Sequence, residues 1–377
     1  MMRADAATTP APTRTRLGRT GLTVSRLCLG TVNFGGRVEE PQAHRLMDHA
    51  FHGGIDFIDT ANIYGWRVHK GHTEEVIGRW FTKAPARRDD VVLATKVGNA
   101  MTDAPGDGGL SAKAVVAACE ASLRRLRTDR IDLYQMHRVD READWAEVWE
   151  AMDRLVRQGK IRYVGSSNFA GWDIATVQTA ASRHRTREEV STHRADLLPG
   201  EAPGHPDRPA ASPPPADERR RPPGLASEQC LYNLLVRHAE LEVIPAARAH
   251  GMAVLPWSPL HGGLLGGVLR KTAAGTAVKS AQGRAETALG DPAVRRAVEA
   301  YERFCAEIGR DPAEVGLAWV TARPGVTSTV IGPRTPEQVD GALRALASPL
   351  NEAETTRLEE LFPPIGRGGP APDAWIT

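Results

Sequence analysis

The sequence lacks any apolar run near the ~20 residues that a membrane-spanning helix needs, so we expect no membrane partner. Its charges nearly cancel, with 48 Lys and Arg against 46 Asp and Glu, which gives no reason to expect nucleic acid as a partner. The first residues lack the apolar segment of a secretory signal, which favours a cytoplasmic protein. The four cysteines form no CxxC or Cys/His cluster, so we expect small buried side chains and no metal at Cys28, Cys119, Cys230 and Cys305.

What the chain does have is a repeated pattern of short apolar runs separated by helical periodicity. Several runs are apolar on consecutive residues, as in parallel strands that are covered on both faces. Eight such strands with helices between them predict an α/β fold, a single-domain (β/α)8 TIM barrel. A doubly wound sheet is the alternative, but no strand leads into G-x-G-x-x-G, so a Rossmann nucleotide site has no support. The runs are RLCLGT, IDFIDTA, VVLATKV, IDLYQMH, RYVGSSN, LASEQCLYN, MAVLPWS and TSTVIG.

The helical segments carry their own end signals. Residues 143–158 place apolar side chains at i, i+3, i+4 and i+7, and 111–127 do the same after Ser111, a plausible N-cap. We predict the barrel over 15–363, with a disordered tail at 1–14 and a second tail at 364–377.

Two stretches interrupt the pattern. Residues 185–224 hold nine prolines and seven arginines without an aromatic residue, so they cannot bury enough apolar surface to offset their ordering entropy. We predict a disordered Pro/Arg-rich insertion between the fifth helix and the sixth strand, on the barrel face away from the chemistry. Residues 261–292 follow the seventh strand and are predicted to be a long loop of the lid or cofactor-clasp kind.

Titratable residues stand at three consecutive strand ends. Asp59 ends one strand with Tyr64 just beyond it, Lys96 ends the next, and His137 ends the third. Each alone has a structural explanation, since an Asp there can cap a helix and a His is more often structural. Because the C-terminal ends of barrel strands face one mouth, the four together predict a catalytic site.

These segments also carry a resemblance. The chain is similar to the aldo-keto reductase superfamily, near the potassium-channel β subunits and the bacterial keto-deoxysugar reductases, over about residues 15 to 362 apart from the insertion. This resemblance implies a (β/α)8 barrel that reduces an aldehyde or ketone with NADPH and uses no metal. It rests on GIDFIDTANIYG, LATKVG, IDLYQMH, KIRYVGSSNF, LYNLLVR, PWSPLHGGLLGG and GVTSTVIGPRTPEQVDGAL.

The resemblance assigns roles to the four strand-end residues. Tyr64 would be the general acid that protonates the alkoxide left by hydride transfer. Lys96 would lower the pKa of Tyr64, and Asp59 would hold the ammonium in place. His137 would orient the carbonyl by a hydrogen bond to its oxygen.

The same likeness implies a set of cofactor-binding residues. Some would bond the nicotinamide carboxamide, an aromatic ring would stack on the nicotinamide, and a glycine-rich loop would run along the pyrophosphate. Read from the residues alone, Thr335 is an N-cap, Pro336 the first helical residue, and Gln338 completes a capping box. With Arg334 before it, this helix start suits the 2′-phosphate of NADPH. The full set is Ser167, Asn168, Gln229, Trp257, Ser258, Leu260, Gly332, Arg334, Thr335 and Gln338.

The chain departs from the family where substrate and adenine would bind. Gly341 and Ala342 stand where Glu-Asn usually contacts adenine. The loop after Tyr64 is longer and more basic than usual, and its Trp66, Arg67 and Lys70 could hold an anionic substrate, such as a dTDP-linked keto-deoxysugar. Otherwise the expected partner is a small carbonyl compound.

Two other functions stay open at this point. The barrel could be a cofactor-binding partner subunit of the channel β type with slow turnover. It could also be a lyase or isomerase that uses Lys96 as a Schiff base. The sequence indicates neither the substrate nor an oligomeric state.

Overall fold

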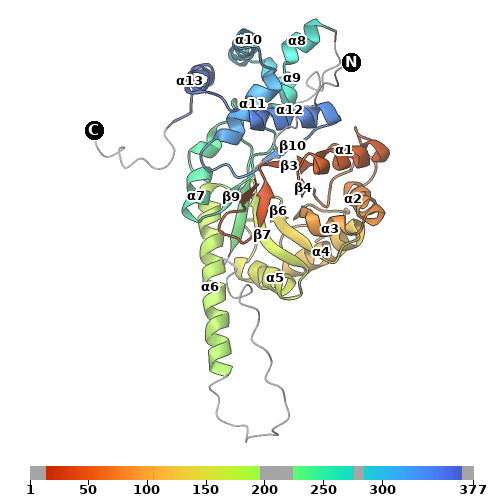
Figure 1. The fold of residues 1–377 in the computed structure, drawn as a ribbon. Coiled ribbons are helices and arrows are strands. Elements are labelled where there is room, and N and C mark those ends of the chain that lie inside the picture. Colours follow the sequence, from red (N-terminus) through yellow and green to blue (C-terminus); the bar gives the residue numbers. More distant parts are fainter. Residues whose placement is uncertain (1–13, 105, 196–223, 276–283, 367–377) are drawn as a thin grey trace, which may run out of the picture.

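Eight parallel strands form the centre of the molecule (Figure 1). The computed structural model describes residues 14–104, 106–195, 224–275 and 284–366. In the sheet each strand pairs with its neighbours in the order β10-β3-β4-β5-β6-β7-β8-β9. The strands are β3 (Leu27–Gly30), β4 (Phe57–Asp59), β5 (Val92–Val97), β6 (Ile131–Met136), β7 (Ile161–Ser167), β8 (Leu225–Gln229), β9 (Ala253–Val254) and β10 (Thr329–Ile331).

Backbone hydrogen bonds also connect the two ends of this order. Val254 forms a parallel bridge with Val326, and the Val330 N–H donates to the carbonyl of Pro256 at 2.9 Å. The structure thus has the predicted α/β class, with eight parallel strands in a curled sheet, and is consistent with the (β/α)8 barrel. All eight strands coincide with the apolar runs that predicted them, and β7 begins one residue earlier, at Ile161.

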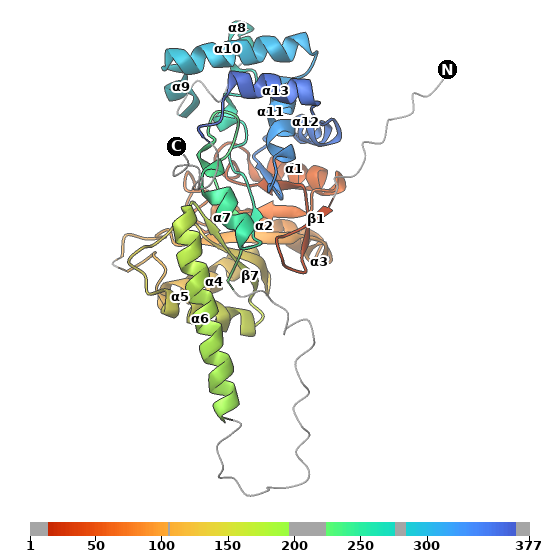
Figure 2. The ribbon, with the colours of Figure 1, turned by 90° about the vertical axis from the view of Figure 1, so that its left-hand side faces the viewer.

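Helices follow the strands along the chain and cover the sheet (Figures 1 and 2). Among the described residues, no helix combines the length and apolar character needed to cross a bilayer. The helices are α1 (Glu40–His52), α2 (His72–Lys83), α3 (Arg87–Asp90), α4 (Ala112–Leu126), α5 (Trp145–Arg157), α6 (Gly171–Ala195), α7 (Val243–Ala249), α8 (Val268–Ala273), α9 (Arg284–Leu289), α10 (Pro292–Glu307), α11 (Pro312–Ala322), α12 (Pro336–Ala347) and α13 (Glu352–Leu361), with the short 3-10 turns η2 (His238–Glu240) and η3 (His261–Gly263).

The two helices predicted from periodicity form where expected. The Ser111 hydroxyl accepts a hydrogen bond from the Ala114 N–H at 3.3 Å and caps α4. In α5 the predicted stripe is buried, including Trp149, Met152 and Leu155, so burial of one face stabilises the helix against the barrel.

The predicted insertion begins later than proposed. Helix α6 continues to Ala195, so residues 185–195 are helical and not disordered (Figure 1). These residues contain neither Gly nor Pro, and the first proline after them is Pro199, so nothing in the backbone chemistry ends the helix at 185. The rest of the insertion, 196–223, lies outside the described residues, as do 1–13 and 367–377 of the predicted tails. The expected loop 261–292 contains η3, α8 and α9 in its described part.

One end of the barrel is closed by an N-terminal hairpin of β1 (Arg14–Arg16) and β2 (Thr23–Ser25). Its turn lies against the start of β9, where the Arg19 N–H donates to the carbonyl of Gly251 at 2.9 Å. Gly18 has φ +57°, and a Cβ there would stand 2.6 Å from the Gly251 oxygen, so only glycine fits this close approach. The mouth therefore opens at the other end, where the strands terminate. The barrel interior beside the hairpin packs Leu17, Val24, Cys28, Phe57, Val92, Ala94, Leu133, Ala226, Ala253, Leu255 and Val330.

Candidate active site

The four predicted catalytic residues meet at the C-terminal ends of β4, β5 and β6. Asp59 is the last residue of β4, Lys96 lies in β5, and His137 directly follows β6. Lys96 Nζ is 2.5 Å from Asp59 Oδ2 and 5.2 Å from the centre of the Tyr64 ring. The Tyr64 and His137 rings are edge to face, with centroids 5.9 Å apart. The structure thus brings together all four side chains.

Asp59 and Lys96 form a buried ion pair. Lys96 also donates to the carbonyl of Thr60 at 3.1 Å, and the other Asp59 oxygen accepts from the amides of Gln135 and Gln229, each at 2.9 Å. Burial by itself lowers the pKa of Lys96, but Asp59 and then Tyr64 raise that pKa, and the net direction is upward. The ammonium therefore stays charged at neutral pH.

Tyr64 is half-buried beside this ammonium. Burial raises the pKa of Tyr64, the Lys96 charge opposes the rise, and Asp59 adds to it, so the net shift is upward. Lys96 lowers the pKa of Tyr64 as predicted from the sequence, but removal of the phenolate from water is the larger effect, so the net shift is upward. Tyr64 is accordingly protonated, in the form that can donate.

His137 is held as a neutral imidazole. Burial, and then the charges of Lys96 and Arg138, lower the pKa of His137 to about 3. The Asn99 amide nitrogen lies 2.7 Å from His137 Nδ1 and donates to it, which places the imidazole proton on Nε2. The ring can therefore donate one hydrogen bond into the mouth.

Residues expected at the nicotinamide surround the same mouth and bond to one another. Asn168 has φ +62°, donates to the carbonyl of His137 and to the Ser167 hydroxyl, each at 3.0 Å, and accepts from Trp257 Nε1 at 3.1 Å. Gln229 is placed differently from the others, since its amide faces Asp59. Asn168, Ser167 and Trp257 therefore form one hydrogen-bonded group beside His137, while the Gln229 amide also joins the ion-pair network, and the cofactor contacts of all four stay a prediction.

The segment after β9 forms a tight turn at the mouth. Ser258 and His261 have positive φ although they are not glycine, and Gly262 and Gly263 follow with φ +68° and +103°. The N–H groups of His261, Gly262 and Gly263 bond within this turn, to Ser258 and Leu260. The resemblance assigns Ser258, Leu260 and this turn to the pyrophosphate of a dinucleotide, and that assignment stays a prediction.

The start of α12 is the helix N-terminus that the sequence predicts as a phosphate site. Pro336 is the first helical residue and Thr335 the N-cap residue, as expected. The capping box does not form, because Gln338 Oε1 accepts from the Arg334 N–H at 2.8 Å and the Thr335 hydroxyl bonds to Glu337. The Arg334 guanidinium and the helix N-terminus together suit a phosphate.

A side-chain hydrogen bond joins the loop before α12 to the rest of the mouth. The carbonyl of Gly332 accepts from the Asn33 amide at 2.9 Å, so the loop after β10 is tied to the loop after β3. Behind it, Ala342 is buried on α12, and Gly341 faces the Arg344–Glu314 pair. The two residues that replace Glu-Asn therefore provide no polar side chain for adenine.

The loop after Tyr64 lies beside the mouth. Trp66 is 51% exposed, and its ring centroid is 6.3 Å from that of Tyr64. Arg67 packs over Gly36, and Lys70 Nζ donates to the carbonyl of Ala100 at 2.9 Å. Trp66 and Arg67 are thus the exposed members of this predicted group, and Lys70 is partly buried.

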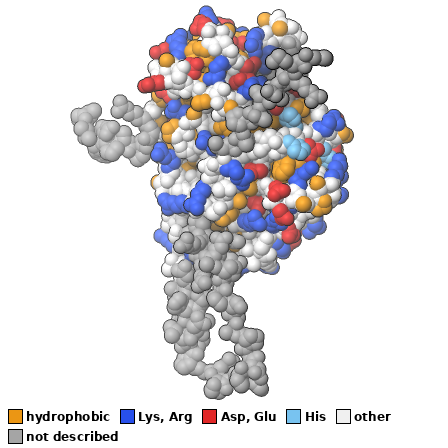
Figure 3. All heavy atoms as spheres, viewed as in Figure 1, with side chains coloured by type: hydrophobic (Ala, Val, Ile, Leu, Met, Phe, Trp, Pro, Cys, Tyr) orange, Lys and Arg blue, Asp and Glu red, His pale blue; other side chains and the backbone are white. Residues whose placement is uncertain are grey.

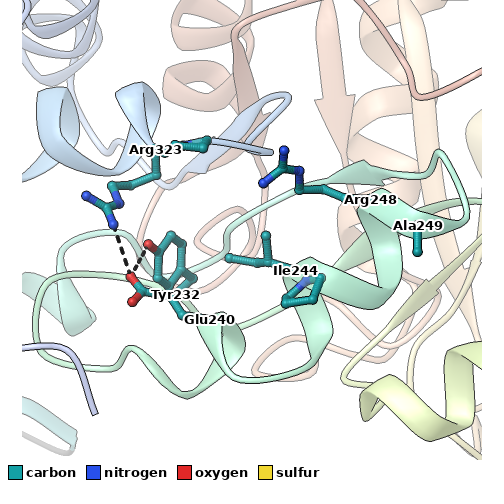
Figure 4. Close-up of a pocket in the computed structure, with 8 residues that line it drawn as sticks. Tyr232, Glu240, Ile244, Arg248, Ala249 and Arg323 are labelled. Atoms are coloured by element: carbon teal, nitrogen blue, oxygen red, sulfur yellow. Dashed lines mark hydrogen bonds and ion pairs between the residues drawn. The ribbon is translucent and has the colours of Figure 1, made fainter. Parts of the chain in front are cut away.

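A separate cavity of about 630 Å³ lies beside α7 (Figure 4). Tyr232 donates to Glu240 at 2.5 Å, and Arg323 lies 3.7 Å from the same carboxylate. None of the residues that line this cavity is among the predicted site residues. They are Tyr232, Glu240, Ile244, Pro245, Arg248, Ala249, Arg323 and Pro324.

The curled eight-stranded sheet and its buried Asp–Lys pair with Tyr and His define a barrel oxidoreductase. Comparison with known proteins agrees, since the model of the Aldo/keto reductase family matches residues 26–192 and 215–362. The chain belongs to the aldo/keto reductase family, whose members are typically NAD(P)H-dependent and act on small molecules.

Named relatives cover most of the chain. It is 44% identical to the uncharacterized oxidoreductase YrpG of Bacillus subtilis, over 96% of this chain and 98% of the relative. It is 28% identical to versiconal hemiacetal acetate reductase of Aspergillus parasiticus, over 93% and 96%. It is also 28% identical to a probable voltage-gated potassium channel subunit beta of Arabidopsis thaliana, over 88% and 90%. These likenesses confirm the superfamily and the branch expected from the sequence.

Three polar residues around the site were not predicted from the sequence. Gln135 bonds to Asp59, Asn99 orients His137, and Glu228 is a fully buried acid in β8. Asn99 could have been found, because it stands three residues after Lys96 at the same strand end. Gln135 and Glu228 lie inside strands, where sequence gives no sign of which buried atoms they reach.

Glu228 anchors the turn that carries Asn168. Its oxygens accept from the Ser166 hydroxyl at 2.5 Å and from the Phe169 N–H at 3.1 Å. Burial raises the pKa of Glu228 to about 8, although both hydrogen bonds lower that pKa. The folded protein thus holds this proton more tightly than the unfolded chain does.

The raised pKa of Glu228 predicts that stability depends on pH. An acid whose pKa is raised by folding stabilises the folded state fully when the pH is below the ordinary pKa of the acid. This stabilisation is lost as the pH rises through the folded-state pKa, about 8. Glu228→Gln imitates the protonated form and removes the titration. The free energy of unfolding of wild type minus that of the variant should therefore fall by roughly 3 kcal/mol between about pH 5 and about pH 8. Urea unfolding at several pH values measures it, with exposed Glu299→Gln as control, and a flat difference would contradict the buried proton.

Proposed function

We propose that the protein is an NADPH-dependent reductase of a small aldehyde or ketone, with Tyr64 as proton donor. The observation that carries this proposal is the joint position of Tyr64, Lys96, Asp59 and His137 at one barrel mouth, with Lys96 Nζ 2.5 Å from Asp59. Protonated Tyr64 and neutral His137 are two hydrogen-bond donors that face the same small region. A carbonyl oxygen that accepts from both is polarised for reduction.

The chain's own residues account for the proton transfer. Bound NADPH would supply the hydride to the carbonyl carbon. Negative charge then develops on the carbonyl oxygen, and Tyr64 donates its proton to that oxygen. The Lys96 ammonium stabilises the resulting phenolate, and Asp59 keeps the ammonium in place. Ser167, Asn168 and Trp257 would hold the nicotinamide end, and Ser258, Leu260 and Gly332 the chain beyond it.

Replacement of the proton donor tests the reaction. Tyr64→Phe should lower kcat by about 10²–10⁴-fold, because general acid catalysis contributes that much, while NADPH binding stays near wild type. Lys96→Met should lose a similar factor through the lost charge. The measurements are NADPH oxidation with a panel of ketones and aldehydes, and cofactor binding by fluorescence.

A matched control is Tyr163→Phe, because Tyr163 lies near the start of β7, at the closed end of the barrel. It should keep full activity. If Tyr64→Phe loses less than tenfold, the proton comes from another group. If wild type binds NADPH but turns over none of the panel, the partner-subunit function is favoured, as in the relatives named as channel subunits.

The preference for NADPH over NADH should depend on Arg334. A charge-assisted bond to a phosphate contributes roughly 1.5–3 kcal/mol, or about ten- to hundredfold in affinity. Arg334→Ala should therefore weaken NADPH binding by that factor and leave NADH binding nearly unchanged. Titration calorimetry with both cofactors measures the ratio, with exposed Arg296→Ala on α10 as control. An unchanged ratio would rule out this role.

The substrate proposal rests on the loop after Tyr64. Trp66 offers an open aromatic face beside the proton donor, and Arg67 and Lys70 add positive charge to the same segment. A flat ring with an anionic group fits such a surface by stacking and ion pairing. A dTDP-linked keto-deoxysugar has both features, and we propose it as the preferred substrate class.

The substrate test separates recognition from catalysis. Trp66→Ala with Arg67→Ala should raise KM for a dTDP-linked keto-sugar about tenfold or more, since a stacked ring and a phosphate contact are lost. Turnover of a small uncharged ketone should stay close to wild type. Steady-state kinetics on both substrates measures this. Equal losses on both would mean that the loop supports the barrel and does not recognise phosphate.

A further inference from the structure

Three side chains at the start of α2 form a compact group with two nitrogen ligands and one oxygen ligand. His69, His72 and Glu75 each offer one such atom, and these atoms all lie within 4.8 Å of one another. His69 Nε2 is 3.2 Å from Glu75 Oε1, and His72 Nδ1 is 4.0 Å from Glu75 Oε2. Figure 3 shows exposed histidine side chains on this face of the molecule.

The spacing suits a tetrahedral metal ion. Zinc ligands at about 2.0–2.2 Å from the metal lie about 3.3 Å from one another in a tetrahedron. The His69–Glu75 separation already matches this value, and the His72–Glu75 separation must shrink by less than 1 Å. Two imidazoles and one carboxylate with an open fourth position form a donor set that zinc prefers.

His72 is held in a position that favours a ligand role. The side chain of His72 packs against Gly35 and Gly65. A Cβ added at Gly35 would stand 2.3 Å from His72 Cδ2, and one added at Gly65 would stand 2.7 Å from His72 Cβ. Its Nδ1 is buried, and no described residue provides a hydrogen bond to it. A buried nitrogen without a partner costs free energy that a metal bond would recover.

The surrounding charges permit a cation there. Arg79 lies 3.7 Å from Glu75, but Arg79 is bound through two nitrogens to Glu40, at 2.8 Å each. His69 is half exposed, so the group is open to solvent. The chain's four cysteines are all buried, so none is an exposed thiol that competes for a soft metal.

We propose that His69, His72 and Glu75 bind one Zn²⁺ ion, which fastens the loop after Tyr64 to helix α2. Two backbone hydrogen bonds already hold the two ends of this loop together, since the Gly71 and Thr73 N–H groups donate to the Tyr64 carbonyl at 3.2 and 3.3 Å. A metal ion bound by His69 of the loop and by His72 and Glu75 of α2 would add a second link, on the solvent side of the loop. The site does not depend on the reaction proposed above, since metal binding is measured without turnover.

The test is titration of the metal-stripped full-length protein with Zn²⁺, followed by calorimetry and by amide hydrogen exchange of residues 65–71. One Zn²⁺ should bind per chain, exchange of these amides should slow, and chelator should reverse both effects. Mg²⁺, which prefers oxygen ligands, should give neither effect.

Two variants locate the site without disturbing the packed His72. His69→Ala and Glu75→Gln should each weaken Zn²⁺ binding at least about tenfold, since even groups that only support ligands contribute that much. His52→Ala, an exposed histidine at the end of α1, should bind as wild type does. Failure of wild type to bind Zn²⁺, or unchanged affinity in both variants, would overturn the proposal. Tight binding without slower exchange at 65–71 would refute the fastening of the loop.

Discussion

The buried Asp59–Lys96 pair constrains everything around the mouth. Two charges removed from water are costly, and their attraction repays this only if the remaining polar atoms are also bonded. Gln135 and Gln229 supply those bonds to Asp59, and the Thr60 carbonyl supplies one to Lys96. The partners come from β4, β5, β6 and β8, so one ion pair links four strands across the barrel interior.

This pair also determines the protonation states of its neighbours. Behind the effect of burial, the Lys96 charge further lowers the pKa of His137, while Asp59 and burial keep Tyr64 protonated. The result is two neutral donors beside a fixed cation. An oxygen that gains negative charge meets groups that need little reorganisation, which is the arrangement that electrostatic catalysis requires.

The sequence predicted the parts of this structure that depend on local pattern. Parallel strands covered on both faces must be apolar on consecutive residues, so all eight could be located, and the strand-end rule then grouped Asp59, Lys96 and His137. Properties that depend on distance across the barrel could not be read. The hydrogen bond from the Gln229 amide to Asp59, 170 positions earlier, is one such property.

Other features that the sequence did not reveal have the same origin. The upward pKa shift of Tyr64 depends on burial, which a loop residue does not reveal in sequence. The capping box failed because Gln338 found a nearer donor in the Arg334 N–H. The end of α6 was misplaced because overall composition outweighed the helix-forming residues 185–195.

The length of α6 separates its two ends in their surroundings. At 1.5 Å per residue, its 25 residues span about 37 Å, and it begins at the mouth end of β7 and runs well past the strands (Figure 1). Ala195 therefore lies far from Tyr64, at the end of the barrel away from the mouth. A substitution near Ala195 thus changes a part of the helix that shares no contact with the catalytic residues.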